Sequence, residues 1–476
     1  MAGLSTSHIN PNPNVKLTLR HQICSSFNKQ NQLFSISPSS IKFRCKKGGN
    51  LGLSAVCGSY NFDVVVVGAG IIGLSIARDL LLRSNLSVAV VDASVPCSGA
   101  TGAGQGYLWM VHKTPGTGVW NLALRSQKMW QSLADSVQND GSDPSEALGW
   151  RETGSLLIGR TEDQVKQLKS RVQQLSAAGI RAEYLSDKDL NIREPELEIN
   201  PHSGAAFLPN DCQLDAYRTM AFIEKGNRLF TSQGRYAEFY HDPAVCLIRS
   251  NGKGKIDGIK TQKNTLYGRK AVIIAAGCWT GSLMDKLLQE SDIALHVPIQ
   301  PRKGMLLAIE NFHYLRLKHG VMEAGYVEHQ KSVISASEQV AEDESLSISM
   351  TATRDASGNL LIGSSRQFAG FNTEMNAFIV NRIWERAQEF FPALKEFSVE
   401  TLSEQMNVRI GLRPYMPDGK PVIGTVPGVS NLFLASGHEG GGLSMALGTA
   451  EMITDMILDN PLQLDCKPFA VEGRCC

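Results

Sequence analysis

Three glycines and one aspartate have the spacing of a site that binds the phosphates and the ribose of a dinucleotide. The glycines are Gly68, Gly70 and Gly73, and Asp92 follows them at the end of the next apolar run. In such a site the first glycine allows a tight turn, the second lets the backbone approach a pyrophosphate, and the third lets a helix pack on a strand. The carboxylate accepts hydrogen bonds from the adenosine ribose. The spacing leaves open whether the nucleotide is NAD or FAD.

The residues around these glycines predict the elements that position them. A run of four valines, Val64 to Val67, precedes the first glycine, and a second apolar run, Val88 to Val91, precedes Asp92. Apolar runs without alternation are typical of parallel strands that are buried on both faces. A helix through Leu81 connects the two strands, and its N-terminal amides can face a phosphate. We expect Ala69 and Ile72, which stand between the glycines, to be further ligand contacts.

Three later segments rich in small residues can approach a flat ligand closely. They are residues 97–109, residues 275–279 after the buried strand 271–274, and residues 436–442 before a helix over Met445 to Leu458. Small residues after a strand or before a helix allow a ligand to approach the backbone. We expect these segments to meet the glycine turn around one ligand.

The middle of the chain has a different character. A strand over Gly154 to Gly159 and a charged helix over Glu162 to Ala178 lie in a segment, residues 149–204, that resembles an insertion. Further along, strand-like pieces at 297–309 and 359–363 bracket a polar stretch from Glu328 to Glu344, which predicts an exposed loop. These segments predict a second structural part.

The first 62 residues contain no Asp or Glu but seven Lys or Arg, together with many Ser and Asn. They also lack the continuous apolar stretch of a secretory signal, so an organelle transit peptide is the favoured interpretation. Sparse arginine and the sequence around Cys57 favour a plastid (chloroplast) over a mitochondrion, with residues 1–57 removed. The alternative is a disordered basic tail.

The composition of the chain is that of a globular protein, with 42% hydrophobic and 20% charged residues. Without its first 62 residues the chain has 40 basic and 46 acidic residues, a net charge near −6, which gives no support for nucleic-acid binding. No run approaches 18 apolar residues, so we expect no integral membrane segment. The ten cysteines show no metal-ligand spacing, and we predict no metal site and no disulfide framework.

Six motifs in order resemble the FAD-dependent amino-acid and amine oxidase family, which includes glycine oxidase, sarcosine oxidase and D-amino-acid dehydrogenase. The resemblance spans about residues 61–460. Its motifs are the dinucleotide unit, the loop at Ala100-Thr101, the strand end at 275–279, Pro298-x-x-Pro301-x-x-Gly304, Gly411-Leu412-Arg413-Pro414 with Asp418-Gly419, and Gly437-His438. The preference for FAD over NAD rests on this resemblance.

The resemblance implies an α/β fold with two domains. An FAD-binding Rossmann-like domain is expected from the discontinuous segments 61–148, 205–294 and 405–462. An α+β substrate domain with a mostly antiparallel sheet is expected from 149–204 and 295–404, and residues 463–476 form a C-terminal tail.

The resemblance also implies a set of residues that hold the FAD. Carried over one at a time, these are Gly68, Ala69, Gly70, Ile72, Gly73, Asp92, Thr101, Gly104, Gln105, Gly106, Val245, Ala276, Gly277, Gly437, His438, Gly440 and Gly442. Val245 is expected to offer backbone contacts to the adenine, and the segment from Gly437 directs a helix N-terminus toward the flavin. No residue matches a known pattern for covalent attachment, so noncovalent FAD is expected.

The implied chemistry is the oxidation of a carbon–nitrogen bond in a small amine or amino acid, by hydride transfer from the carbon beside a neutral amine to the flavin. Arg413 is expected to clamp a substrate carboxylate with its planar pair of donors; the alternative is a structural ion pair in a turn. Tyr326 and His438 are weaker candidates for the substrate pocket and the flavin edge, and an ordinary buried Tyr or His is the alternative for each.

One departure from the family bears on the substrate. Glycine oxidase-like members place a second arginine soon after the Gly-His pair, where this chain has Glu439, Gly440 and Gly441. That difference puts glycine itself in doubt and leaves a bulkier amino acid, an N-substituted amino acid or an amine. The expected electron acceptor is O2. Two alternatives are a dehydrogenase that passes electrons to a quinone or carrier, and a flavin-containing assembly factor without turnover.

Overall fold

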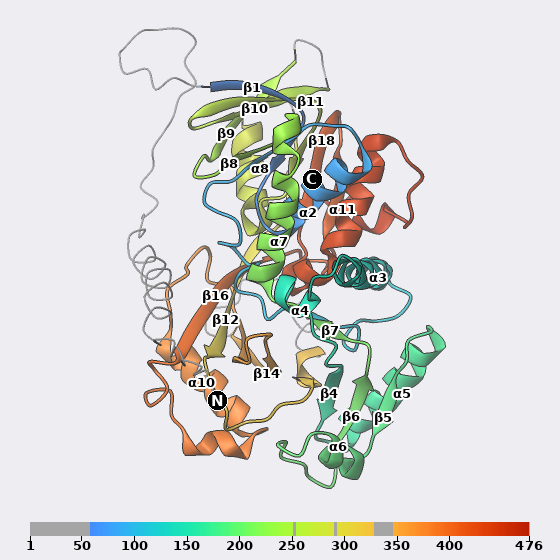
Figure 1. Ribbon diagram of the computed structural model, residues 1–476, viewed down its shortest axis with the longest axis vertical. Helices are drawn as coiled ribbons and strands as arrows, with labels where there is room; N and C mark the ends of the chain where they lie inside the picture. The colour runs from blue at the N-terminus through green and yellow to red at the C-terminus, as the bar shows by residue number, and fades with distance from the viewer. Residues whose placement is uncertain (1–57, 251–253, 290–292, 328–345, 476) are drawn as a thin grey trace, which may run out of the picture. The chain divides into compact units, whose positions relative to one another are not determined.

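The computed structural model describes residues 58–250, 254–289, 293–327 and 346–475. The expected transit segment, residues 1–57, lies outside the described residues, and so does the loop expected from Glu328 to Glu344. Figure 1 shows the elements discussed below.

The first sheet is built around the glycine turn. Its central strand β1 (Gly58–Val67) pairs in parallel with β2 (Val88–Val91) on one side and with β11 (Asn264–Ile274) on the other. The strand order is β17-β18-β11-β1-β2-β8, with β10 beside β11 and β9 beside β10. The remaining strands of this sheet are β8 (Tyr236–Phe239), β9 (Ala244–Arg249), β10 (Ile256–Thr261), β17 (Val422–Val426) and β18 (Val429–Ser436).

Both faces of this sheet are covered, which is why its central strands are apolar without alternation. Val64 and Val66 of β1 pack with the helices of one layer, and Val65 and Val67 pack toward β10 and the short helix α8 (Thr280–Leu288). The helices of the first layer are α2 (Ile71–Arg83), α3 (Gly118–Asn139), α7 (Ala216–Arg228) and α11 (Gly442–Leu458). Helix α11 contacts both α2 and α3, as Figure 1 also shows.

The second sheet has the order β16-β12-β15-β14-β13-β4-β6-β5 and is antiparallel except between β13 and β4. Its strands are β4 (Ser155–Gly159), β5 (Glu183–Leu185), β6 (Gly204–Leu208), β12 (Gln300–Ile309), β13 (Gly320–Glu323), β14 (Ser347–Arg354), β15 (Leu360–Arg366) and β16 (Met406–Tyr415). One face packs on α10 (Ala377–Gln388) in an apolar core that includes Met305, Leu307 and Trp384. A short pair, β3 (Tyr107–Leu108) and β7 (Cys212–Gln213), lies apart from both sheets.

The α/β fold class is confirmed, while two strands differ in place from the sequence grouping. Strand β16 pairs with β12 along its whole length, and β6 pairs with β4, so both belong to the second sheet. The family resemblance places residues 406–415 and 205–208 in the expected cofactor segments 405–462 and 205–294. Register, which depends on distant partners, decides their place.

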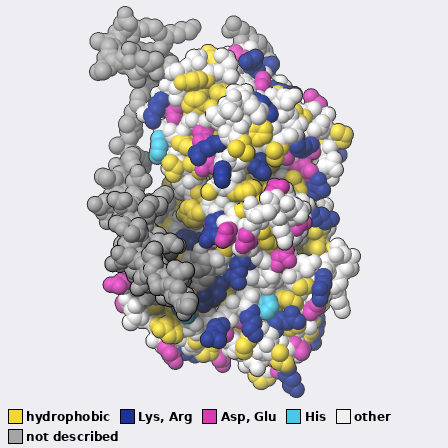
Figure 2. Space-filling model, in the orientation of Figure 1, with side chains coloured by type: hydrophobic (Ala, Val, Ile, Leu, Met, Phe, Trp, Pro, Cys, Tyr) yellow, Lys and Arg dark blue, Asp and Glu magenta, His cyan; other side chains and the backbone are white. Residues whose placement is uncertain are grey.

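The remaining helices lie outside the two sheets. Helix α4 (Pro144–Ala147) lies between α3 and β4 in the chain, and α5 (Glu162–Ala177) and α6 (Asp187–Arg193) connect the strands β4, β5 and β6 of the second sheet. A short helical turn, Lys467–Phe469, lies in the C-terminal segment. No helix among the described residues is long and apolar enough to cross a membrane. On the face shown in Figure 2, basic and acidic side chains are interspersed.

Candidate functional site

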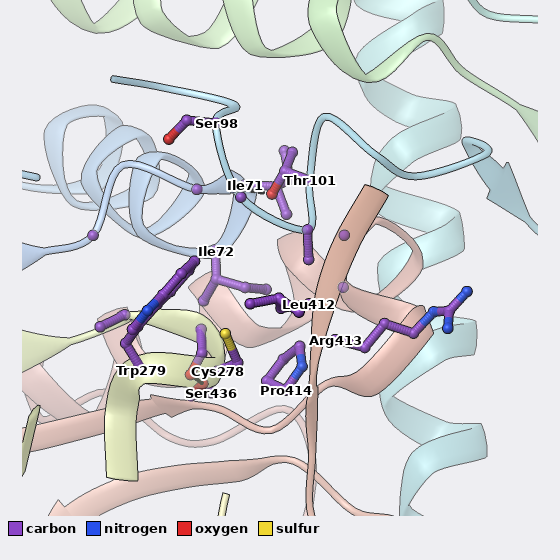
Figure 3. Close-up of a pocket in the computed structure, with 18 of the residues that line it drawn as sticks. Ile71, Ile72, Ser98, Thr101, Cys278, Trp279, Leu412, Arg413, Pro414 and Ser436 are labelled. Atoms are coloured by element: carbon purple, nitrogen blue, oxygen red, sulfur yellow. Dashed lines mark hydrogen bonds between the residues drawn. The ribbon is translucent and has the colours of Figure 1, made fainter. Parts of the chain in front are cut away.

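A cavity of about 640 Å³ lies where the carboxyl ends of β1, β2 and β11 meet the strands β12 and β16. We call it the central cavity. Its wall comes from the turn after β1, the loop 92–107, the start of β9, the turn after β11, and the segment that leads into α11. Ligands of open α/β sheets bind outside the carboxyl ends of the strands, and this cavity has that position. Figure 3 shows its lining, with Trp279 and Arg413 on opposite sides.

The glycine turn has the shape that its sequence predicted. A side chain at Gly68, whose φ is +117°, would overlap the carbonyl of Ala275, and one at Gly73 would overlap the carbonyl of Gly68. At Gly70 the nearest atom to an added Cβ is the Thr101 hydroxyl oxygen at 3.4 Å, because this glycine lines the cavity. Gly68 and Gly73 therefore serve the packing of the turn, and Gly70 leaves room for a ligand.

Asp92 lies at the edge of the central cavity with both carboxylate oxygens oriented by the backbone. Its Oδ2 accepts from the amide of Ala69 and its Oδ1 from the amide of Ser94, each at 2.7 Å. Burial raises the pKa of this carboxyl, and the two amide hydrogen bonds oppose that shift. A carboxylate fixed in this way retains lone pairs for the hydroxyls of a ribose, so the turn and Asp92 together fit the ADP half of FAD.

The segment before α11 presents backbone amides to the cavity. The helix begins at Gly442, its N-cap Gly441 supplies no side-chain cap, and Gly440 and Gly442 line the cavity. His438 beside them is 4% exposed, and its Nε2 lies 2.9 Å from the Thr449 hydroxyl. Burial lowers the pKa of His438 to about 3, so the ring is neutral at physiological pH. The helix N-terminus rather than this histidine supplies positive potential here.

Two cysteines, Cys97 and Cys278, also line the central cavity. Both are buried, and burial raises the pKa of each thiol to about 12. A protonated thiol is a poor nucleophile. The two thiols that line the cavity are therefore held in their unreactive form.

Arg413 projects from β16 on the side of the cavity opposite Trp279 (Figure 3). Its guanidinium crosses Gly304 of β12, where any side chain would overlap it, and its Nη1 donates to the carbonyl of Ser365 at 3.0 Å. No carboxylate among the described residues lies within 4.0 Å of it, which argues against a structural ion pair. The remaining donors of the guanidinium are available to a ligand.

Tyr326 lies behind the cavity wall rather than in it. It is 4% exposed, and its hydroxyl is 2.8 Å from that of Tyr107, which does line the cavity. Burial raises the pKa of Tyr107 well above its ordinary value, so its hydroxyl stays protonated. The face of the Tyr326 ring packs on the guanidinium of Arg366, whose Cζ lies 3.9 Å from the ring centroid.

Glu439 directly follows the Gly437-His438 pair. It adopts a φ of +47°, accepts from the Gly440 amide, and lies 3.3 Å from Nη1 of Arg302. Arg413, Arg302 and Arg366 together lower the pKa of its carboxyl against the effect of burial. Glu439 is therefore an anion inside a cluster of arginines.

Most of the residues predicted to hold the cofactor meet at the central cavity. Those that line it are Gly68, Gly70, Ile72, Asp92, Thr101, Gly104, Gln105, Gly106, Ala276, Gly277, Arg413, His438, Gly440 and Gly442. The predicted residues outside the lining are Ala69, Gly73, Val245, Gly437 and Tyr326. At the expected adenine end, the two residues that directly precede Val245, Pro243 and Ala244, line the cavity.

The sequence did not point to several residues of the site. Tyr107, Trp279, Arg302 and Arg366 lie in or behind the cavity wall, and none was singled out as a site residue. A usable signal was present in β12, where the apolar core residues Met305, Leu307 and Ile309 have the spacing of one strand face, so that Arg302 and Gly304 fall on the other face. Period-two alternation places Arg302 and Gly304 on one face of the strand, toward the cavity.

The fold and the cavity define an FAD-binding oxidoreductase. Residues 63–456 match the family described as FAD dependent oxidoreductase, and the chain belongs to this family. It is 24% identical over 416 residues to a glycine oxidase of Geobacillus kaustophilus, covering 87% of this chain and 97% of that protein. It is 25% identical over 309 residues to a D-amino acid dehydrogenase of Vibrio cholerae, covering 64% of this chain and 63% of that protein.

Solved structures share the fold. The crystal structure of the glycine oxidase from Geobacillus kaustophilus matches with a TM-score of 0.70 at 22% identity, covering 87% of this chain and 99% of that one. An L-proline dehydrogenase from P. horikoshii also matches with a TM-score of 0.70, at 17% identity, covering 87% of this chain and 98% of that one. The expected recognition as an FAD-dependent oxidoreductase is confirmed.

Proposed function

We propose that this enzyme oxidises the carbon–nitrogen bond of an amino acid or a secondary amine, with O2 as the electron acceptor. The observation that carries the proposal is Arg413, a cavity-lining guanidinium without a carboxylate partner among the described residues. Similarity to a glycine oxidase and to a D-amino acid dehydrogenase supports the same substrate class.

Each group of residues around the cavity has its own role in this proposal. Arg413 binds the substrate carboxylate through its free donors. Leu306 and Leu412 line the cavity with apolar surface and exclude water from the reacting carbon. The Tyr107 hydroxyl, held by Tyr326, offers a hydrogen-bond partner to the amine. Bound FAD supplies the hydride acceptor, and the amides at the start of α11 offer positive potential near it.

The FAD in this proposal is noncovalent. The residues expected to hold it are those of the glycine turn, Asp92, the loop through Gly106, and the segment before α11. The neutral thiols of Cys97 and Cys278 support this state, because formation of a thioether requires a reactive sulfur. The first sheet with its helices forms the cofactor part in this proposal, and the second sheet with α10 forms the substrate part. The chain is further proposed to enter plastids through residues 1–57.

Product analysis tests the proposed reaction. The purified protein is mixed in air with a panel of amino acids, N-methyl amino acids and simple amines. The proposal expects ammonia or a primary amine together with a carbonyl compound, and hydrogen peroxide in equal amount. Product formation only with an anaerobic dye acceptor would replace O2 by a carrier, and no product under either condition would overturn the function.

A further inference from the structure

A surplus of buried positive charge surrounds the substrate end of the central cavity. Arg302 and Arg413 are direct partners across β12 and β16, and Arg366 ends the neighbouring strand β15. Arg302 is 3% exposed and Arg366 is 1% exposed. The guanidinium groups of all three act on the Glu439 carboxyl, so the four side chains form one electrostatic cluster.

Glu439 supplies one negative charge to three arginines, and Arg413 and Arg302 act on its carboxyl more strongly than Arg366. Its Oε1 pairs with Arg302 at 3.3 Å, and Arg302 also lies over the rings of Phe368 and Tyr415. Arg413 donates only to a carbonyl among the described residues. Arg366 donates from Nη1 to the Ser349 hydroxyl at 3.3 Å, while its Nε and Nη2 are buried without a hydrogen-bond partner among the residues that the structure describes. Within the described part of the chain, two guanidinium charges thus remain without a carboxylate.

The nearby lysine does not change this count. Lys113 is 8% exposed, and the carboxylate that acts on it most strongly is Asp211. Glu439 acts on Lys113 less strongly, so Asp211 rather than Glu439 is its main counter-charge. Among the described residues, the cluster therefore has an excess of two positive charges beside the cavity. An amino acid with one carboxylate would neutralise only one of these two charges.

We propose that the substrate carries two anionic groups. Arg413 binds one of them, and the positive charge of Arg366, which lies on the far side of the Tyr326–Tyr107 pair, stabilises the other. This inference rests on the proposed function and specifies its substrate class as an acidic amino acid or an N-carboxyalkyl amino acid. Buried charges without counter-ions are costly, and a doubly negative ligand supplies both counter-charges. Arg366 acts through Tyr326 and is a positioning residue, because that ring separates it from the cavity.

The test is a comparison of two ligands of the same shape and different charge. Succinate and its monoamide, succinamate, are titrated at constant ionic strength into the FAD-loaded protein, and dissociation constants are measured by calorimetry and by the change in flavin absorption. Neither ligand contains an amine, so binding is measured without turnover. The wild type is expected to bind succinate at least about tenfold more tightly, as one additional charge pair in a site of low polarity implies.

Substitutions of Arg366 and of Glu439 are expected to change the ratio of the two dissociation constants in opposite directions. Arg366→Met should bring the ratio of the two dissociation constants close to one, whereas Arg366→Lys should retain most of it. Glu439→Gln removes the internal anion and should raise the ratio several-fold. Arg193→Met is the matched control, because Arg193 stacks on Phe207 at 4.2 Å beside the same sheet but away from the cavity. It should leave the ratio unchanged.

The alternative use of the surplus charge is to stabilise negative charge on reduced flavin. Equal binding of succinate and succinamate by the wild type, or a Glu439→Gln ratio at or below the wild-type ratio, would overturn the proposal. An Arg366→Met protein with a lower flavin potential but an unchanged ratio would assign Arg366 to the flavin instead. Reduction by monocarboxylic amino acids without charge preference would leave the proposed function intact and refute this inference alone. Preferential succinate binding without reduction of the flavin by any amine would support the charge preference of the site and refute the proposed function.

Discussion

At the scale of single residues, the proposed chemistry depends on Arg413 and on the unreactive groups around it. Arg413 retains free donors because Gly304 leaves space for its guanidinium to cross the neighbouring strand. His438, which the sequence offered as a candidate at the flavin edge, is buried and neutral. Charge at the substrate end therefore depends on arginines and one glutamate rather than on a histidine.

Arg413→Ala should weaken substrate affinity by roughly ten- to a hundredfold, because a charge-assisted contact of about 1.5–3 kcal/mol is lost. Arg413→Lys should recover only part of this loss, since an ammonium cannot reproduce the paired donors. KM and anaerobic dissociation constants measure the effect. Arg409→Ala, on the same strand but outside the cavity lining, should have wild-type affinity. Loss of FAD from both Arg413 variants would assign this residue to the cofactor.

His438 should make the folded protein less stable in acid. Its pKa is about 3 in the folded protein and about 6.5 in an unfolded chain, so the unfolded state binds more protons between these values. The free energy of unfolding then falls as the pH drops below 6.5, by roughly 2 kcal/mol between pH 7 and 5. In denaturant unfolding over the same pH range, the free energy of unfolding of His438→Gln should fall less than that of the wild type, by about that amount. An unchanged fall, matching that of the exposed-site control His313→Gln, would contradict a neutral His438.

At the scale of elements, local patterns predicted the cofactor side well and the substrate side only in part. The predicted helix from Glu162 to Ala178 matches α5 within one residue at each end, and the side chain of Thr161 caps its N-terminus. Helix α10 and strand β14 were missed. Both carry a local pattern that could have marked them. In α10 the apolar residues Ile379, Ile383 and Ala387 have helical spacing, and in β14 Ile348, Met350 and Ala352 alternate with Ser and Thr residues.

The glycine turn gives a prediction at this scale. Gly70→Val should fold and remain colourless, because the turn accepts a Cβ and the new side chain fills the space along the backbone. Absorption spectra of the purified protein and its far-ultraviolet circular dichroism separate cofactor loss from misfolding. Gly325→Val is the control, since its nearest atom is at 3.8 Å and it lies outside the cavity. A yellow Gly70→Val protein would refute the assigned site.

At the scale of the whole molecule, two sheets meet at one cavity, and each contributes different chemical groups to its surroundings. The first sheet provides backbone amides and Asp92, and the second provides the arginines. Composition and the family motifs predicted the two parts. The placement of β6 and β16 was beyond them, because pairing between strands depends on long-range register.

The N-terminal segment gives a prediction for the complete chain. A fusion of residues 1–62 to a fluorescent protein should enter plastids and be shortened near Cys57, because a basic, Ser-rich segment without acids has the composition of a transit peptide. Microscopy and the mass of the imported product measure both steps. A cytosolic or exclusively mitochondrial signal would contradict plastid import.

The most direct test of the central claim is anaerobic reduction of the bound flavin. Purified protein is mixed without oxygen with the amine and amino-acid panel, and the visible absorption of the flavin is followed over time. We expect at least one amino acid to bleach the flavin, with an α-deuterated form reacting more slowly and Arg413→Ala requiring a higher concentration. Failure of every amine to bleach a flavin that dithionite reduces readily would contradict the assignment of this protein as an enzyme that oxidises carbon–nitrogen bonds.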